Sequence, residues 1–214
     1  MRFADRSDAG RRLGEWLRSR LPPGRYRIFG LARGGVVVGS EVARALGAAL
    51  EVLAAVKIGA PGEPELAAGA VAEGGGVYWE GETLRHFGVD FEWRERALEE
   101  ARRELERRRS AYRAGPLEPP DAGETAIIVD DGIATGSTVL AAIDGLRRMG
   151  AERVIVAAPV ASRESMQQLE RVADRVEVLH TPGGFGAVGG YFEAFEPVSD
   201  EDVRRCLGGG SEPG

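Results

Sequence analysis

Short apolar runs alternate along the chain with segments in which apolar residues recur every three or four positions. The runs have the length and β-branched content of buried strands, and the intervening segments have the periodicity of amphipathic helices. Strands are predicted over residues 26–31, 49–56, 126–129, 153–158 and 176–179. Helices are predicted from Ser7 or Asp8 to Pro22 and over 36–46, 90–113, 136–149, 162–172 and 200–207. This order predicts an α/β fold, with a mostly parallel sheet flanked by helices on both faces.

Residues 58–88 interrupt the pattern with many glycines and prolines. Within them, residues 66–72 and 77–79 could pair as a hairpin. A long segment of this composition inside a compact domain is often a lid or a binding loop.

The stretch 125–149 combines a buried strand, two carboxylates, a turn rich in glycine and hydroxyl groups, and an amphipathic helix. Asp130 and Asp131 stand at the carboxyl end of the strand, and residues 136–138 are predicted to form the N-terminus of the helix. Unpaired N–H groups, the helix dipole and nearby hydroxyls make such an end a site for a phosphate dianion. Adjacent acids suit a ribose bound through its hydroxyls or through Mg²⁺, so a sugar phosphate fits both halves. Ordinary helix capping is the alternative interpretation.

A second glycine-rich turn, Ala32, Arg33, Gly34 and Gly35, joins the first predicted strand to its helix. Small residues let the backbone approach a ligand closely, and Arg33 supplies a cation, so a diphosphate would suit this loop. Lys57 follows the next predicted strand, where a lysine is usually solvated.

The string IIVDDGIATGST resembles the phosphoribosyl diphosphate (PRPP) signature of the type I phosphoribosyltransferases, and LARGG resembles their pyrophosphate loop. The resemblance implies transfer of the 5-phosphoribosyl group of PRPP to a nucleobase or similar nitrogen nucleophile, with Mg²⁺ and release of pyrophosphate. It also implies a nucleotide-salvage role and a homodimer.

The resemblance further assigns roles to individual residues. Asp130 and Asp131 would hold the ribose hydroxyls or the metal, and Arg33 and Lys57 would meet the diphosphate. Backbone and side-chain groups of the two loops would bind PRPP: Ala32, Gly34, Gly35, Gly132, Ile133, Ala134, Thr135, Gly136, Ser137 and Thr138. A flexible lid would span 58–76, and a hood over the base would be formed partly by 180–207.

The acceptor is not assigned by these motifs. Ala134 matches the adenine-type motif, whereas oxopurine enzymes place an aspartate there. The segment FGAVGGYFE resembles the oxopurine hood, so a purine is slightly preferred. The hood aromatics, Phe185, Tyr191, Phe192 and Phe195, could either stack on a heterocycle or cover the edge of the core.

Composition narrows the possible partners and compartments. A net charge of −6 argues against binding to nucleic acid or an anionic membrane, and the eight arginines of 90–113 are accompanied by six glutamates. No apolar run is long enough to span a membrane, and the N-terminus does not resemble a signal peptide, so we expect a cytoplasmic protein. Cys206 is the only cysteine, so no internal disulfide is possible. We expect one domain over 1–207 and a disordered tail over 208–214.

Two other functions fit parts of these observations. A non-catalytic PRPP or nucleotide sensor could use the same fold, although residues 1–26 are too few for a winged helix. PRPP synthesis would need a longer, two-domain chain and an ATP site. Retention of Arg33, Lys57 and a long lid favours catalysis.

Overall fold

The computed structural model describes residues 1–113 and 115–208. Its helices are α1 (Arg6–Arg20), α2 (Gly34–Leu46), α3 (Gly81–His86), α4 (Phe91–Tyr112), α5 (Ser137–Arg148), α6 (Arg163–Leu169) and α7 (Asp200–Gly208), with short 3₁₀ turns η1 (Glu73–Gly75) and η2 (Val188–Tyr191). Its strands are β1 (Arg25–Leu31), β2 (Ala49–Leu53), β3 (Ala55–Ala60), β4 (Glu63–Ala72), β5 (Gly76–Trp79), β6 (Glu124–Val129), β7 (Arg153–Val160) and β8 (Arg175–His180).

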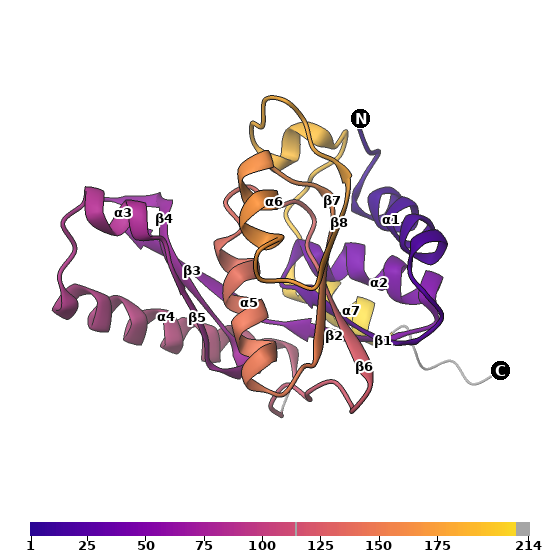
Figure 1. Cartoon of the computed structure of the whole chain (residues 1–214), viewed down its shortest axis with the longest axis horizontal. Coiled ribbons are helices and arrows are strands. Elements are labelled where there is room, and N and C mark those ends of the chain that lie inside the picture. The colour runs from indigo at the N-terminus through magenta and orange to yellow at the C-terminus, as the bar shows by residue number, and fades with distance from the viewer. Residues whose placement is uncertain (114, 209–214) are drawn as a thin grey trace.

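A five-stranded parallel sheet in the order β2-β1-β6-β7-β8 forms the centre of the molecule. Helices α5 and α6 lie on one side of it, and α1 and α2 lie on the other (Figure 1). Parallel strands need crossover connections, and the intervening helices supply them. The predicted fold class is therefore confirmed.

Strand β6 shows how the sequence builds the two hydrophobic layers, one on each face of the parallel sheet. Ile128 packs with the apolar face of α5, whereas its neighbour Ile127 packs with α1 and α2. Both side chains are fully buried. Successive side chains point to opposite faces of a strand, so a continuous apolar run is required where both faces are covered.

The prediction of a single strand over 49–56 is wrong, because these residues form two strands, β2 and β3, that belong to different sheets. The chain leaves the parallel sheet at Ala54, whose N–H donates to a carboxylate oxygen of Glu73 at 2.8 Å. Glu73 is itself buried and forms an ion pair with Arg113. This polar anchor was not recognisable from apolar periodicity, since residues 49–56 are apolar on both sides of the break.

Strands β3, β4 and β5 form an antiparallel sheet that projects from the core together with α3 and α4, and we call residues 55–112 the arm (Figure 1). The predicted pairing of 66–72 with 77–79 is confirmed, with Val71 opposite Val77. The segment predicted as a flexible lid, 58–76, accordingly contains the hairpin of β3 and β4, whose register shifts on both sides of Gly59, and the turn η1. Its role as a lid stays a prediction.

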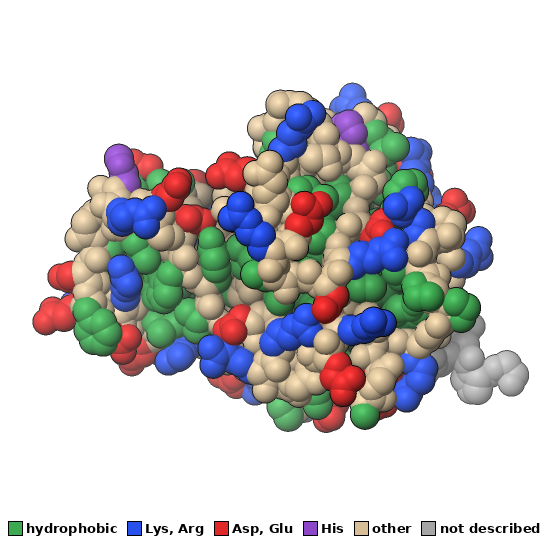
Figure 2. Space-filling model, viewed as in Figure 1, with side chains coloured by type: hydrophobic (Ala, Val, Ile, Leu, Met, Phe, Trp, Pro, Cys, Tyr) green, Lys and Arg blue, Asp and Glu red, His purple; other side chains and the backbone are tan. Residues whose placement is uncertain are grey.

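Helix α4 matches its prediction closely, and its charges behave as expected for a solvated face. Arg103 contacts Glu99 at 2.9 Å and Arg107 contacts Glu104 at 2.7 Å, so arginines pair with acids one turn away. Figure 2 shows the same interspersed basic and acidic side chains over the face that it displays.

The N-terminal segment of the chain lies beside the hood (Figure 1). Phe3 exchanges backbone hydrogen bonds with Tyr191 (2.9 Å) and Glu193 (2.8 Å), and its ring is buried against Phe192. Gly208 ends α7, so the predicted tail begins one residue inside a helix, and residues 209–214 lie outside the described ones. Among the described residues, no helix is long and apolar enough to cross a lipid bilayer.

Candidate functional site

Two loops that are about 100 residues apart in sequence meet at the carboxyl edge of the parallel sheet. One joins β1 to α2 and the other joins β6 to α5, and they meet because β1 and β6 are neighbouring strands with Gly30 opposite Val129. A Cβ atom on Gly34 would lie 1.9 Å from Oδ2 of Asp131, and one on Gly35 would lie 2.4 Å from the Val129 carbonyl oxygen. The two glycines are therefore needed for contact between the loops themselves.

The N-terminus of α5 presents free backbone N–H groups, as predicted. Gly136 has φ +78°, a conformation that favours glycine. The first helical hydrogen bond runs from the Leu140 N–H to the Gly136 carbonyl oxygen at 2.8 Å. Within the described part of the chain, the N–H groups of Ser137, Thr138 and Val139 have no acceptor. Thr135 and Ser137 place their hydroxyl oxygens 3.3 Å apart at this end. The arrangement can bind a phosphate dianion.

Ile133 anchors the loop and its side chain is not available to a ligand. It is 1% exposed, its N–H donates to the Val160 carbonyl at 2.9 Å, and its own carbonyl accepts from the Ser162 N–H at 2.9 Å. The Ser162 hydroxyl also donates to the Ala134 carbonyl at 2.7 Å. These bonds hold the exposed residues Ala134 and Thr135 at the sheet edge.

The two acids are largely shielded from solvent and interact with each other. Burial, followed by the neighbouring Asp131 charge, raises the pKa of Asp130 well above its usual value. Burial also raises the pKa of Asp131, although the Arg6 guanidinium opposes that rise. The Asp131 N–H donates to Oδ1 of Asp130 at 2.9 Å. The pair can hold a cation or the hydroxyls of a sugar, because either would compensate the buried charge.

Arg6 was not predicted as a site residue. Its Nε lies 2.6 Å from Oδ2 of Asp131, so the opening helix reaches the acids. Helix α1 begins at Arg6 because Asp5 caps it by accepting from the Asp8 N–H at 2.7 Å. The predicted starts at Ser7 or Asp8 missed this turn. A lone arginine in a helix rich in arginine carries no sequence signal of such a contact.

The two predicted diphosphate-binding cations lie in different surroundings. Arg33 is about half exposed at the start of α2, and its guanidinium lies 3.8 Å from the Asp200 carboxylate. The peptide bond between Ala32 and Arg33 is cis. Lys57 lies within β3 on the arm, and its ammonium contacts the carbonyl of Glu65 at 3.0 Å and its carboxylate at 3.3 Å. The structure thus pairs Lys57 with the arm, not with the acids at the end of β6.

The two acids could coordinate a magnesium ion whose other ligands are not protein side chains. Within residues 1–113 and 115–208, no group of three or more His, Cys, Asp or Glu side chains is placed to hold a metal. Mg²⁺ commonly takes only one or two carboxylates from a protein and completes its shell with waters and substrate phosphates. Asp130 and Asp131 could supply that share.

The hood aromatics divide between the two predicted roles. Phe192 is 2% exposed and belongs to the core with Phe3, and Phe195 packs against Phe192 with ring centroids 4.9 Å apart. Phe185 and Tyr191, with ring centroids 5.4 Å apart, are half-buried, as is Phe195. The half-buried rings remain candidates for stacking on a flat ligand.

Comparison with known proteins gives a consistent result. A family model described as phosphoribosyl transferase domain matches residues 5–186. A Mycobacterium tuberculosis protein whose name assigns it provisionally to the phosphoribosyl transferases is 39% identical over 205 residues, which is 96% of this chain and 46% of that protein. The chain therefore spans about half the length of the curated relatives it matches.

Two solved structures are also similar. The crystal structure of TT1426 from Thermus thermophilus shares 42% identity and a TM-score of 0.79, over 97% of this chain and 98% of that one. The AQ2163 protein of Aquifex aeolicus has a TM-score of 0.50 at 12% identity, over 81% of this chain and 73% of that one. The second likeness shows the fold alone.

Proposed function

The chain belongs to the family of phosphoribosyl transferase domains, and we propose that it transfers the 5-phosphoribosyl group of PRPP to a nucleobase or a similar nitrogen acceptor. In this reaction the bond from the anomeric carbon to the diphosphate breaks, a bond to the acceptor nitrogen forms with inversion, and pyrophosphate leaves. The family resemblance further suggests a nucleotide-salvage role for this reaction.

One observation supports the proposal most strongly. The free N–H groups of α5 begin six residues after two buried carboxylates, and the Gly34–Gly35 loop lies directly against those carboxylates. An anion site next to an acid pair suits a ligand that carries a phosphate and hydroxyls on one small frame. PRPP has both, and its diphosphate would extend toward the second loop.

The described residues supply three parts of the mechanism. The N-terminus of α5, with Thr135, Ser137 and Thr138, binds the 5-phosphate and fixes the position of the sugar. Asp130 and Asp131 accept hydrogen bonds from the ribose hydroxyls or bind Mg²⁺, which would supply charge neutralisation of the leaving diphosphate. Their negative charge also stabilises positive charge that develops on the ribose ring, as in glycoside cleavage.

The diphosphate is assigned to the β1–α2 loop. Backbone groups of residues 32–35 approach it, and the half-exposed Arg33 exchanges its Asp200 partner for the ligand. Lys57 would join only if it left Glu65, which is itself 98% exposed in its side chain and therefore a weak competitor. Movement of the 58–76 hairpin toward the sheet edge would bring Lys57 to the diphosphate. The same movement would shield the reacting atoms from water.

The acceptor and the assembly are proposed from the family resemblance. Ala134 is exposed at the position where oxopurine enzymes carry an acid, so its side chain cannot act as a general acid or base. The base stays unassigned, and a purine is slightly preferred. A homodimer stays a prediction, which sedimentation of the purified protein would test.

Pyrophosphate release tests the proposal. The protein is incubated with PRPP, Mg²⁺ and each member of a panel of nucleobases, and we expect release with at least one of them. The double variant Asp130→Asn with Asp131→Asn should abolish turnover but keep the fold, whereas the exposed Asp121→Asn should retain it. Retained turnover in the double variant would remove the acids from the mechanism.

A silent panel would have a distinct meaning. Tight PRPP binding without pyrophosphate release on any base would favour a non-catalytic PRPP or nucleotide sensor on the same fold. Absence of both binding and release would overturn the PRPP assignment.

A further inference from the structure

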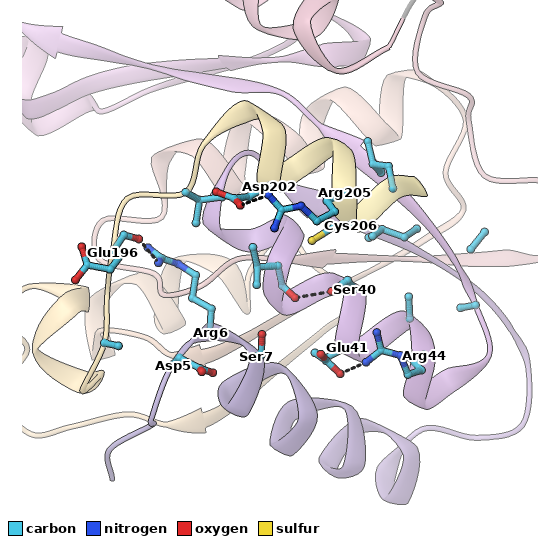
Figure 3. A pocket seen from close by; sticks show the side chains of 18 of the residues that line it. Asp5, Arg6, Ser7, Ser40, Glu41, Arg44, Glu196, Asp202, Arg205 and Cys206 are labelled. Atoms are coloured by element: carbon cyan, nitrogen blue, oxygen red, sulfur yellow. Dashed lines mark hydrogen bonds and ion pairs between the residues drawn. The ribbon is translucent and has the colours of Figure 1, made fainter. Parts of the chain in front are cut away.

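Arg6 connects the acid pair to the C-terminal hood. Its Nε contacts the Asp131 carboxylate at 2.6 Å, its Nη1 donates to the Glu196 carbonyl oxygen at 2.7 Å, and its guanidinium carbon lies 3.8 Å from the centre of the Phe195 ring. Figure 3 shows the side chain extending from the start of α1 toward Glu196. One guanidinium therefore contacts the predicted sugar site and two consecutive residues of the hood.

The surroundings fix this geometry. The side chains of Arg6 and Asp131 are 12% and 15% exposed, so the ion pair is shielded from solvent far more than the surface pairs of α4. Backbone pairing of residues 3–4 with 191–194 holds the start of α1 against the hood. A cavity of about 1030 Å³ is lined by both Arg6 and Glu196.

We propose that Arg6 is a positioning residue that couples the hood to the sugar site, an inference that rests on the proposed function. It orients the Asp131 carboxylate for the ribose and ties residues 195–196 to that orientation. Binding of a sugar phosphate then restrains the hood, and displacement of the hood loosens the acid. The acceptor end of the site is thereby ordered when the sugar end is filled.

Charge alone would not perform this role. The guanidinium offers several donors in a rigid plane, and Arg6 uses one for Asp131 and another for Glu196 while its face rests on Phe195. A lysine in its place would keep the positive charge, but its donors would all stand on one nitrogen and it would have no planar face to rest on Phe195. Arg6→Lys therefore separates coupling from simple neutralisation.

The test measures binding of ribose 5-phosphate by calorimetry, together with amide hydrogen exchange of Glu193 and Ala194. These amides donate to the Phe3 and Ala4 carbonyls and report on the hood. In the wild type we expect binding that slows their exchange. Arg6→Ala and Arg6→Lys should each weaken affinity by about tenfold, which corresponds to ~1.4 kcal/mol, and should remove the added protection.

Arg12→Ala is the matched control. It removes an arginine from the same helix that also lies over an aromatic ring, 5.6 Å from the centre of Phe3, but contacts Asp8 instead of the site acids. Affinity and protection should stay within twofold of the wild type. If Arg6→Ala does not fold, Phe195→Leu replaces it, because it removes the ring under the guanidinium without changing a charge.

Two outcomes would overturn the inference in distinguishable ways. Arg6→Lys that binds ribose 5-phosphate and protects the hood as the wild type does would show that positive charge at this position suffices and that the guanidinium does not position the acid. Absence of ribose 5-phosphate binding by the wild type would instead overturn the proposed function, and the inference would fall with it.

Discussion

Asp130 illustrates a conflict between stability and function at the scale of a single residue. Its carboxyl group is buried beside a second carboxyl, and both circumstances raise its pKa. The folded protein therefore binds a proton at Asp130 more tightly than the unfolded chain does. Ionised Asp130 destabilises the free protein, which is tolerable if a ligand compensates the charge.

Replacement of Asp130 by asparagine should therefore stabilise the protein. Because the folded-state pKa is raised, the destabilisation is absent below the unfolded value of about 4 and grows as pH rises toward the folded value. We expect Asp130→Asn to gain at least ~1 kcal/mol at neutral pH and little at pH 3, measured by urea unfolding. Its amide oxygen can still accept from the Asp131 N–H.

The exposed Asp121→Asn serves as the control for this measurement, and its stability should change by less than about 0.5 kcal/mol at either pH. A loss of stability in Asp130→Asn at neutral pH would show that the buried carboxylate is already compensated within the free protein.

At the scale of elements, the arm is held to the core by direct contact between backbones. A Cβ atom on Gly145 of α5 would lie 2.0 Å from the Glu73 carbonyl oxygen, and one on Gly76 of β5 would lie 2.0 Å from the Ala141 carbonyl oxygen. Glycine is therefore required on both sides of this junction. The buried pair of Glu73 and Arg113 closes it from the side of β2.

Gly145→Ala should consequently destabilise the protein, opposite to the usual effect in a helix. Alanine in a helix interior ordinarily gains about 0.5–1 kcal/mol over glycine. Here the added methyl group must displace the backbone of Glu73, which should cost roughly 1–3 kcal/mol. Thermal unfolding would measure the change.

Gly81→Ala, where the nearest atom is the flexible end of Arg85 at 3.3 Å, provides the comparison. Gly81→Ala should leave the thermal stability of the protein unchanged. A Gly145→Ala variant as stable as the wild type would mean that α5 and the arm separate at little cost.

At the scale of the whole molecule, the arm and the hood belong to different parts of the fold, and the acid pair lies on the core that connects them (Figure 1). The hood is tied to the core through the N-terminal segment and Arg6, whereas the hairpin of the arm is joined to the core only at its base. Closure over a ligand would therefore come from movement of the arm more than from movement of the parallel sheet.

Limited proteolysis tests this difference. PRPP with Mg²⁺ should suppress cleavage within 58–76 several-fold, because the hairpin packs over the bound ligand. Cleavage within the connector 115–123, which precedes β6, should be unaffected by PRPP and serves as the internal control. Equal cleavage of 58–76 with and without PRPP would contradict a lid function for this hairpin.

The sequence by itself determined the local units of this protein. The strand, turn and helix of 125–149 could be predicted because apolar periodicity, two terminal acids and a positive-φ glycine all depend on neighbouring residues. The same holds for α4, and the alternation of strands with helices predicted a mostly parallel sheet but not the order of its strands. The region around the candidate phosphate site is built mainly from such a unit, and it was predicted well.

Only the tertiary structure decided which units meet. The break after β2 depends on Glu73 nineteen residues away, the position of Lys57 depends on a sheet edge, and the contact of Arg6 with Asp131 spans 125 residues. Such contacts have no periodicity and no fixed spacing, because the whole packing arrangement sets them. For that reason the acids and the candidate phosphate loop were visible in the sequence, whereas the arginine that contacts Asp131 was not.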